Sequence, residues 1–436
     1  LMRWVGVDVG GTFTDVVVYD EATGTLEVGK SPTSPADPTV GLLNAFAKLK
    51  VVLPDTGRVV HGTTIGTNAI LERKGAPVWV ITTRGFRDAL EIARTNRTVL
   101  YDIRGLKPAP LVPRHQIVEV DERMAFDGSI LRPLRDADVR GAVACIRDSA
   151  NGGEPGAAVI CFLHSYANPG HEQAAARIAE ELLPGWYVCT SSEVLPEFRE
   201  YERFTTAVLN AYIGPKVGGY LTSLSASLAS RGYAGRVFIT TSSGGIMTSE
   251  VAARLPVQTV LSGPAGGVAA ALDLGRVSGF HNLITYDMGG TSTDVCLIEQ
   301  LEPTITTEQQ IAGLPNRTPQ IEINSIGAGG GSLAWIDAGG ALRVGPRSAG
   351  ADPGPAGYGR GGTEPTITDA NLLLRRVPAD RPLAGEVLLD DDLARRAIHR
   401  LIGRVPGITD EAQLAEGIIR IAVARMVSAI KEISIS

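Results

Sequence analysis

Residues Asp8–Asp15 read DVGGTFTD and residues Asp287–Asp294 read DMGGTSTD, so one eight-residue pattern returns 279 positions later. Six of the eight positions are identical: both aspartates, both glycines and both threonines. Each copy lies between two apolar runs, as in VGVDVGGTFTDVVVYD and LITYDMGGTSTDVCLIE. This pattern predicts a buried strand, a tight Gly-Gly turn and a returning strand. Two such hairpins predict two related half-domains that face each other.

The turn residues of both copies suit a phosphate group. A glycine backbone can approach a ligand closely, and successive N–H groups can converge on an anion. The threonine hydroxyls add short hydrogen-bond donors. The predicted phosphate-binding residues are Gly10, Gly11, Thr12, Thr14, Gly289, Gly290, Thr291 and Thr293.

The aspartates of the pattern need a cation beside the phosphate. Asp8 and Asp287 stand at strand ends, and a carboxylate does not bind phosphate directly at neutral pH. Mg²⁺ accepts carboxylates, water and phosphate oxygens together, so we expect these two residues to hold it. Asp15 and Asp294 either orient the loops or cap the hairpins. The alternative is a pair of ordinary hairpins that bind nothing.

A second polar cluster, HGTTIGTN from His61 to Asn68, lies between a predicted strand and a helix expected over 68–74. One interpretation is a cleft wall that faces the substrate or the transferred phosphate, made by His61, Thr63, Thr64 and Asn68. The other is helix N-capping by a threonine, which needs no ligand.

Three glycine-rich stretches carry weaker signals. SGPAGG (262–267) is either an anion site at a helix N-terminus or a tight turn before a helix at 268–274. GAGGGS (327–332) lacks dinucleotide-binding spacing, so it is a turn near the cleft or a plain glycine-rich hairpin. The composition of residues 338–365 predicts a long loop. Its candidate functional side chains are Arg347, Asp352 and Arg360.

The segment GTLEVGKS (24–31) satisfies the P-loop pattern by chance. A P-loop follows a buried strand and opens a helix, whereas TLEVGK alternates like a strand, and Pro32 and Pro35 follow it. Lys30 is therefore expected to be a solvated charge at a strand end.

Composition narrows the class of protein. A chain of 436 residues with 44% hydrophobic and 20% charged residues fits a globular protein of at least two domains. A net charge of −6 without a basic stripe gives no support for nucleic-acid binding, and no apolar run approaches a membrane span. The four cysteines lack a C-x-x-C spacing and predict reduced core thiols in a cytoplasmic protein.

Segments along the chain predict two domains, 1–200 and 201–436. Helices are expected over 201–212 and 217–229, and EAQLAEGIIRIAVARMVSAIKEI predicts a final amphipathic helix.

Beyond these local patterns, the paired loops resemble those of the actin, sugar-kinase and Hsp70-like ATPases. The sequences of six blocks are similar to those of the hydantoinase A / 5-oxoprolinase family, and the blocks occur in order across nearly the whole chain. They are VGVDVGGTFTD, HGTTIGTNAILERKGA, LSGPAGGV, YDMGGTSTDV, IGAGGGSLAWID and VGPRSAGADPGPAGYGRGG.

The resemblance implies a fold and a reaction. The fold would be an actin-like (ribonuclease H-like) α/β fold of duplicated half-domains, the second apparently truncated because the family's adenosine-binding stretch would follow the last helix. ATP would phosphorylate the carbonyl oxygen of a lactam or cyclic imide, and water would then open the ring, usually with a hydantoinase B-type subunit. In this scheme Asp8, Asp287, Thr12 and Thr291 act in phosphoryl transfer. An ATP-dependent ketone carboxylase and a non-catalytic nucleotide-binding chain remain alternatives.

Overall fold

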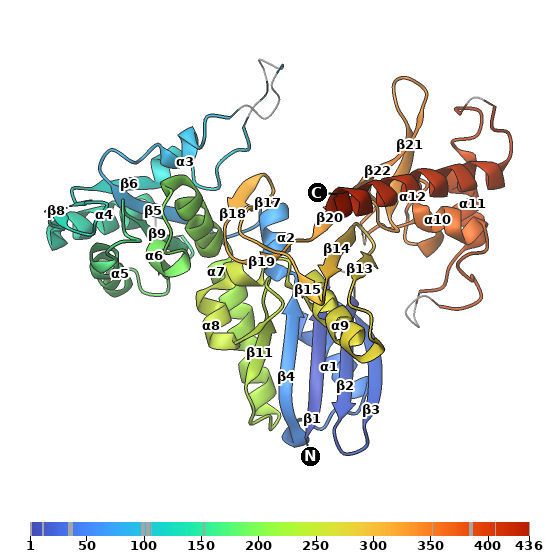
Figure 1. Cartoon of the computed structure of the whole chain (residues 1–436), viewed down its shortest axis with the longest axis horizontal. Coiled ribbons are helices and arrows are strands. Elements are labelled where there is room, and N and C mark those ends of the chain that lie inside the picture. Colours follow the sequence, from blue (N-terminus) through green and yellow to red (C-terminus); the bar gives the residue numbers. More distant parts are fainter. Residues whose placement is uncertain are drawn as a thin grey trace.

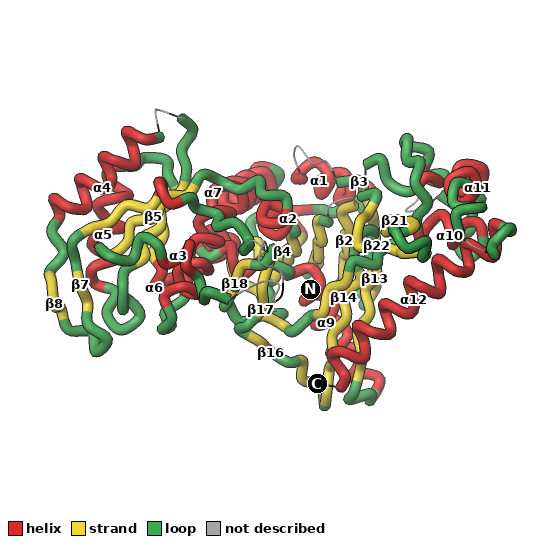
Figure 2. The backbone as a smooth tube through the Cα atoms, turned by 90° about the horizontal axis from the view of Figure 1, so that it is seen from above, coloured by secondary structure: helices red, strands yellow, loops and turns green. Residues whose placement is uncertain are grey.

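A computed structural model gives the fold of the chain. It describes residues 2–10, 13–33, 38–96, 101, 105, 107–150, 153–350, 352–382, 387–405 and 407–435. Three lobes follow one another from left to right in Figure 1, and the view from above in Figure 2 agrees. Among the described helices, none combines the length and the apolar character that a membrane span requires.

The central lobe is built on a six-stranded sheet in the order β12-β11-β4-β1-β2-β3. The first three strands form the predicted antiparallel meander, β4 pairs with β1 in parallel, and β11 pairs with β4 in parallel. The strands are β1 (Arg3–Val9), β2 (Phe13–Asp20), β3 (Thr25–Pro32), β4 (Thr56–Thr63), β11 (Val237–Thr240) and β12 (Ile246–Thr248). The sheet thus takes strands from both sides of residue 200, and the two predicted domains stay a prediction.

The left-hand lobe holds a four-stranded parallel sheet in the order β10-β9-β5-β6. Its strands are β5 (Val78–Thr83), β6 (Ile117–Val120), β9 (Ala157–Cys161) and β10 (Tyr187–Thr190). One face packs on the amphipathic helices α4 (Asp136–Ser149) and α5 (Gly170–Leu182), which bury Trp79 and Ile160. Because both faces are covered, the strands are almost wholly apolar, as is usual for parallel sheets.

A single helix, α7 (Glu200–Ser230), replaces the two helices that the sequence predicts. Pro215 lies inside it and costs a helix about 3 kcal/mol or more, because one backbone hydrogen bond is lost. Ile213, Val217 and Leu221 are buried on either side of the proline. Burying such side chains contributes about 1.5–3 kcal/mol each, so packing outweighs the lost bond.

The second hairpin forms as predicted, from β13 (Leu283–Met288) and β14 (Thr293–Glu299). The strands β15 (Glu302–Pro303) and β20 (Asn324–Ile326) also pair with β14. Helix α9 (Ser262–Ser278) begins six residues earlier than predicted and packs on β13 and on the central sheet.

The right-hand lobe surrounds the final helix α12 (Glu411–Ile435), which confirms the predicted last helix. The predicted long loop at 338–365 is wrong in part, because β22 (Leu342–Ser348) lies within it and pairs with β21 (Ser332–Ile336). Apolar side chains on the strand pair bury against α12, which explains the strand despite the many glycines. Helices α10 (Ile367–Leu373) and α11 (Asp391–His399) complete this lobe.

The remaining elements lie within or between these lobes. They are α1 (Pro38–Lys48), η1 (Leu53–Asp55), α2 (Ile65–Leu71), α3 (Ala89–Ile92), η2 (Arg114–Gln116), β7 (Arg123–Met124), β8 (Ile130–Arg132), α6 (Ser191–Val194), α8 (Ser249–Arg254), η3 (Pro256–Thr259), β16 (Ile305–Thr306), β17 (Gln309–Ile311), β18 (Leu314–Asn316), β19 (Gln320–Ile321) and η4 (Ala356–Tyr358).

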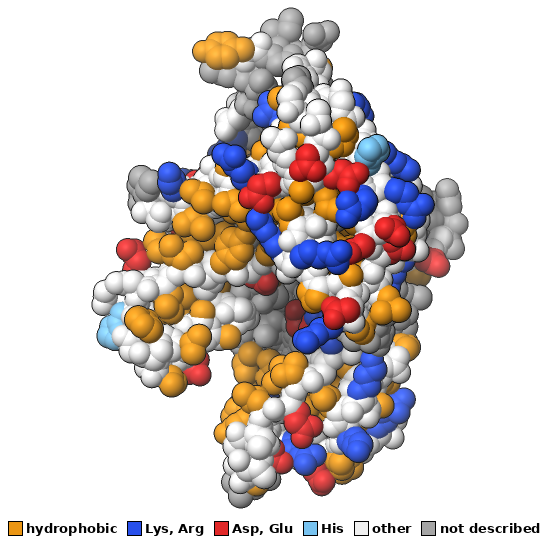
Figure 3. All heavy atoms as spheres, turned by 90° about the vertical axis from the view of Figure 1, so that its right-hand side faces the viewer, with side chains coloured by type: hydrophobic (Ala, Val, Ile, Leu, Met, Phe, Trp, Pro, Cys, Tyr) orange, Lys and Arg blue, Asp and Glu red, His pale blue; other side chains and the backbone are white. Residues whose placement is uncertain are grey.

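Surface charges of both signs are interspersed over the right-hand lobe, as Figure 3 shows. The ion pairs Arg376–Glu416 and Arg395–Glu411 are examples at 2.8 and 2.7 Å. The face in Figure 3 therefore carries no stripe of one sign. The cysteines are free thiols, but Cys145 is exposed, so the prediction that all four lie in the core is wrong for this one.

Buried polar side chains join α7 to the carboxyl ends of the parallel strands. The Arg203 guanidinium is fully buried and donates to the Phe162 and Glu197 carbonyls and to Ser191 Oγ. Ser191 Oγ in turn donates to the buried Glu172 carboxylate at 2.7 Å. Fully bonded networks of this kind rigidify a fold, whereas removal of one member leaves the others unpaired.

Replacing this arginine should destabilise the whole chain. We expect Arg203→Ala to lower the free energy of unfolding by about 3–5 kcal/mol, because the buried Glu172 charge loses its compensation. Urea unfolding followed by circular dichroism measures this change. The matched control is Arg177→Ala on the exposed face of α5, which should stay within about 0.5 kcal/mol of the wild type. A loss under about 1 kcal/mol for Arg203→Ala would contradict the structural role of the network.

Candidate functional site

The two hairpins have the same register and bring their aspartates together. Asp8 pairs with Asp15 across β1 and β2, and Asp287 pairs with Asp294 across β13 and β14. The pKa of Asp8 is raised by its partial burial and then by the negative charges of Asp15 and Asp287. Charges from both hairpins therefore act on one another, as the repeat predicts for two facing loops.

The Asp8 carboxylate lies in a cradle made by three strands and a helix. Asp8 pairs with Gly62 of β4, and the neighbouring position on β11 is Thr240. A Cβ on Gly62 would lie 3.1 Å from Asp8 Oδ1 and 3.4 Å from Thr240 Oγ1, so a side chain there would fill the cradle. The first turn of α9 closes it, since a Cβ on Gly263 would lie 3.7 Å from the same carboxylate oxygen.

Thr240 is a candidate site residue that the sequence does not reveal. Its Oγ1 is buried, and it has no hydrogen-bond partner in the part of the chain that the structure describes. A buried, unpaired hydroxyl beside a carboxylate suits a ligand or a water molecule held between them. Only the parallel pairing of β11 with β4 places it there, and that pairing leaves no signal in the local sequence.

Negative charge exceeds positive charge at this site. Lys30, which is partly exposed near the end of β3 as the sequence predicts, pairs with Asp15 at 2.8 Å. In the second copy, the partner of Asp294 across the sheet is Ser325, which carries no charge. Partial burial raises the pKa of Asp294, and Asp287 raises it further, against the hydrogen bond from Ser325.

A cation would balance the four carboxylates, which face one ammonium group. Among the described residues, no group of three or more His, Cys, Asp and Glu side chains is placed to hold a metal directly. Two opposed carboxylates instead fit a cation that completes its shell with water and phosphate oxygens, as Mg²⁺ does.

The glycine run 327–332 braces the second turn. Gly330 N donates to the Gly289 carbonyl at 2.9 Å, and Gly331 N donates to the Gly290 carbonyl. A Cβ on Gly329 would lie 2.6 Å from the backbone of Thr291, which excludes any side chain there. The described structure therefore favours a packing role for this run over direct contact with phosphate.

Gly290, by contrast, is not required by the fold. A Cβ there meets no atom within 4 Å, and its φ lies outside the left-handed range. Gly290 and Thr291 are exposed at the tip of the hairpin. A glycine that packing does not demand is explained if a ligand approaches the turn closely.

Two predicted phosphate-binding threonines lie inside the fold. Thr14 and Thr293 are fully buried, since they point to the opposite face of their strands from the aspartates. Thr293 Oγ1 donates to the Ala328 carbonyl at 2.7 Å, and Thr14 Oγ1 bonds Thr33 Oγ1 at 3.0 Å. Their contact with phosphate stays a prediction. Gly10 directly follows β1, whereas Gly11 and Thr12 lie outside the described residues.

The second polar cluster divides between core and cleft. His61 is fully buried, and its Nε2 lies 2.9 Å from Tyr220 Oη of α7. Burial lowers the pKa of His61 to about 4, so the imidazole is neutral. This placement turns His61 away from the Asp8 face of the sheet, and a substrate contact has no support from it.

The hydroxyl of Thr64 ties the cluster to the first hairpin. Thr64 is the N-cap of α2, but its Oγ1 donates to the Val9 carbonyl at 3.2 Å rather than capping the helix. Asn68 donates to Thr64 Oγ1 at 3.3 Å, and Thr63 Oγ1 accepts from the Ile65 amide. The helix begins three residues earlier than predicted. Thr64 and Asn68 thus lie beside the end of β1, where a substrate role stays a prediction.

The structure places the remaining sequence motifs in β3, at the start of α9 and in the right-hand lobe. Residues 24–31 lie in β3 and its preceding turn, which confirms that GTLEVGKS is not a P-loop. SGPAGG forms the first turns of α9, whose start is fixed by the bond from Leu261 N to Thr67 Oγ1. Arg347 stacks over Trp335 and lies 3.9 Å from Glu364, in the right-hand lobe.

A hollow of about 390 Å³ adjoins the second hairpin. It lies between α9 and β13, and its walls are mainly apolar, with Asp287 and Asp294 among the lining residues. Asp287 and Asp294 therefore border open space as well as each other.

Two glycine substitutions separate packing from ligand access. We expect Gly329→Ala to lower the free energy of unfolding by about 1–3 kcal/mol, because its Cβ would overlap the second turn. Gly290→Ala is the matched control, because Gly290 lies in the same contact between the glycine run and the second turn. Its free energy of unfolding should stay within about 0.5 kcal/mol of the wild type. Thermal unfolding of both variants measures this. Equal stability of the two variants would show that the glycine run does not brace the hairpin.

Stability should depend on pH through Asp8. Its pKa is higher in the folded chain than the ordinary 3.8, so the ionised carboxylate costs stability above the raised pKa. Asp8→Asn should therefore stabilise the metal-free chain at pH 7–8, and the gain should vanish as the pH falls below the ordinary value. Denaturant unfolding across this pH range tests the sign.

The control for this experiment lies on the same two strands. The hydrogen bond from Arg3 lowers the pKa of Asp20, so its charge stabilises the fold at neutral pH. Asp20→Asn should therefore destabilise where Asp8→Asn stabilises. A loss of stability for both variants at pH 7–8 would contradict the repulsion between the hairpins.

Comparisons with known proteins agree with the blocks in the sequence. The family described as hydantoinase/oxoprolinase matches residues 203–436, and its N-terminal region matches residues 4–183. The chain is 40% identical to an uncharacterized protein of Methanocaldococcus jannaschii and 36% identical to the caprolactamase subunit alpha of Pseudomonas jessenii. Each match covers 99% of this chain, but only 65% and 62% of the respective relative.

Two solved structures share the fold. An ATP-dependent caprolactamase from Pseudomonas jessenii matches with a TM-score of 0.82 and 34% identity, over 99% of this chain and 63% of that one. A nucleotide-free acetone carboxylase matches with a TM-score of 0.84 and 29% identity, over 98% of this chain and 62% of that one. From the two family matches and these relatives, the chain belongs to the hydantoinase/oxoprolinase family.

Proposed function

We propose that this chain binds Mg-ATP between its two hairpins and phosphorylates the carbonyl oxygen of a cyclic amide, as part of an ATP-dependent hydrolase. The observation that carries the proposal is the pair of facing hairpins in one register, with four carboxylates against one lysine. The caprolactamase among the relatives is described as ATP-dependent. Because the chain spans under two thirds of the relatives reported above, the activity belongs to the complete protein.

The hairpins would form an actin-like fold of duplicated half-domains. The first copy includes β1 to β4, and the second begins with β13 to β15. The chain spans 65% and 62% of the two curated relatives reported above. A hydantoinase B-type subunit is the partner that the family resemblance implies.

The chain's own residues would act by position and charge. Asp8 and Asp287 would hold Mg²⁺ through water, and the ion would neutralise phosphate charge when bound. The Gly290 turn would offer backbone N–H donors to the phosphates, and Thr291 would add its hydroxyl. Fixed donors of this kind supply most of what a protein contributes to phosphoryl transfer.

The proposed reaction would consume one ATP and two water molecules for each ring that is opened. The carbonyl oxygen of the amide attacks the γ-phosphorus, and the bond to the β-phosphate oxygen breaks, which releases ADP. One water molecule then adds to the activated carbon, and the ring C–N bond opens with a proton to nitrogen, which leaves an acyl phosphate. A second water molecule hydrolyses the acyl phosphate to the carboxylate and free phosphate. Thr240 and Asp8 lie together where a reacting group or a water molecule would be oriented.

A second candidate keeps the nucleotide site and changes the acceptor. The match to acetone carboxylase at a TM-score of 0.84 favours it. ATP would then activate a ketone or bicarbonate instead of a lactam.

The first test is calorimetric titration of Mg-ATP, and separately Mg-pyrophosphate, into the chain. We expect both to bind, and we expect Asp287→Ala and Gly290→Ala to weaken binding roughly ten- to hundredfold, because bonds to charged groups contribute about 1.5–3 kcal/mol. Asp148→Ala on exposed α4 is the matched control and should bind as the wild type does. Absence of binding by a folded chain would mean that this chain alone has no nucleotide function.

The acceptor is tested with the complete protein and its partner. Release of ADP that depends on a lactam supports the hydrolase, whereas release that depends on a ketone with bicarbonate supports the carboxylase.

A further inference from the structure

The hydrogen bonds that brace the second turn continue into the right-hand lobe. Gly331 N donates to the Gly290 carbonyl at 2.6 Å. The same peptide group contains the Gly330 carbonyl, which accepts from Thr368 N at 2.8 Å and from Thr368 Oγ1 at 2.9 Å. An unbroken path of hydrogen bonds therefore runs from Thr368, in α10, through two peptide groups to the turn that carries Thr291.

The path ends on the peptide group between Gly290 and Thr291. In a planar trans peptide the carbonyl and the N–H point in opposite directions, so the bond to the Gly290 carbonyl directs the Thr291 N–H away from Gly331. No residue whose position is described accepts a hydrogen bond from this N–H, and Thr291 is exposed at the tip of the hairpin. A donor that is fixed in direction and open to solvent suits an anionic ligand.

Thr368 lies on a rigid support. At the start of α10, Thr366 Oγ1 accepts from Asp369 N, and the Asp369 carboxylate accepts from Thr366 N and Oγ1, which together form a capping box. The same carboxylate accepts from Gly357 N at 2.7 Å, and Asp369 is fully buried. The hydroxyl that donates to Gly330 is therefore fixed in place before any ligand arrives.

The Thr368 hydroxyl gives the Gly330 carbonyl a second donor. Thr368 N already pairs this carbonyl, and an oxygen with two lone pairs accepts both bonds at once. Hydrogen bonds in a chain polarise one another, so an added donor at one end strengthens the N–H at the other. The hydroxyl is thus not needed to satisfy Gly330, and its effect is exerted at the far end of the path, on Thr291.

We propose that Thr368 is a positioning residue for the second phosphate loop. Its hydroxyl acts through the two peptide groups to orient the Thr291 N–H and to strengthen it as a donor to a phosphate oxygen. This inference rests on the proposed function, because it names what fixes a donor that the nucleotide site would use. Thr368 itself lies two peptide groups behind the ligand.

The first measurement needs no ligand. In a chain labelled with 15N-threonine, the amide signal of Thr291 is the one that Thr291→Ser removes. Thr368→Val keeps the shape of the side chain and removes the hydroxyl, so the Thr291 amide proton should shift upfield as its peptide group loses polarisation. Thr368→Ser keeps the hydroxyl and should leave the signal in place.

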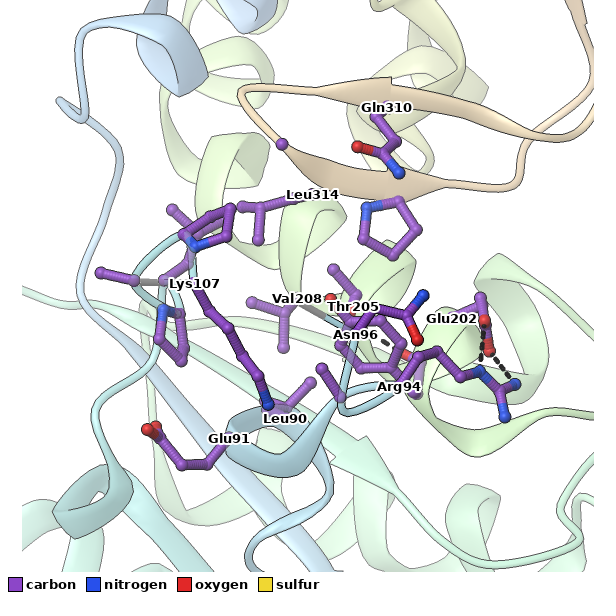
Figure 4. Close-up of a pocket in the computed structure, with 18 of the residues that line it drawn as sticks. Leu90, Glu91, Arg94, Asn96, Lys107, Glu202, Thr205, Val208, Gln310 and Leu314 are labelled. Atoms are coloured by element: carbon purple, nitrogen blue, oxygen red, sulfur yellow. Dashed lines mark hydrogen bonds and ion pairs between the residues drawn. The ribbon is translucent and has the colours of Figure 1, made fainter. Parts of the chain in front are cut away.

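The second measurement is calorimetric titration of Mg-pyrophosphate into the same variants. Thr368→Val should bind about two- to fivefold more weakly than the wild type, whereas Thr368→Ser should bind within about twofold of it. The matched control is Thr205→Val, because Thr205 Oγ1 also donates to a backbone carbonyl, that of Tyr201, at 2.7 Å. Thr205 lines a separate cavity that shares no lining residue with the hollow beside Asp287, as Figure 4 shows for its surroundings. Thr205→Val should bind as the wild type does.

A second variant breaks the same contact from its other side. A Cβ on Gly330 would lie 2.8 Å from Thr368 Oγ1, so Gly330→Ala should displace the hydroxyl and weaken Mg-pyrophosphate about two- to fivefold. Thr368→Ala removes the atom that the new methyl group meets. The double variant should therefore bind no more weakly than Thr368→Ala alone, because residues that act through one contact are not additive.

Three outcomes would overturn the proposal: an unmoved Thr291 signal in Thr368→Val, wild-type affinity for Mg-pyrophosphate in that variant, or additive losses in the double variant. A different result would count against the proposed function instead. If the wild-type chain binds no Mg-pyrophosphate while the Thr291 signal still moves in Thr368→Val, the path to Thr291 is confirmed and the phosphate site is wrong.

Discussion

Repulsion between carboxylates is the constraint around which this chain is organised. Partial burial is the largest cause of the raised pKa of Asp8, and the charges of Asp15 and Asp287, brought near by two hairpins of one register, raise it further. A fold retains such a cluster only if the surrounding structure holds it in place. The parallel strand β4 and the start of α9 hold the first hairpin, and the glycine run 327–332 holds the second. Strain kept at a site in this way is typical of ligand binding.

The two copies are equivalent in register but not in surroundings. Asp15 is neutralised by Lys30, whereas Asp294 meets Ser325. Strand β1 is paired on both edges, while the structure as described pairs β13 only with β14. The first copy is therefore the more rigid and the less negative of the two. A cation between them would gain most of its attraction from the second copy and most of its fixed geometry from the first.

The local sequence pattern was enough to predict both hairpins, because apolar runs on either side of a Gly-Gly turn favour one structure. It also placed Asp8 and Asp287 correctly at strand ends. It could not place Thr240, whose relevance depends on β11 joining β4 from about 180 positions along the chain. Nor could it show that His61 points into the core, since a polar residue on a strand is assigned to a face only when the sheet order is known. The continuity of α7 between the two predicted helices also depends on tertiary burial, which the local sequence does not show.

Helix α7 links the buried polar network of the left-hand lobe to the strand that positions the first hairpin. Thirty-one residues make it about 46 Å long, and it runs from Arg203 to Tyr220, which bonds His61 of β4. Close packing fixes it along its length, as a Cβ on Gly214 would lie 2.5 Å from the Tyr187 ring. Val217 of the same helix packs beside Gly66 of α2. The position of Gly62 against Asp8 therefore depends on packing that lies outside both hairpins.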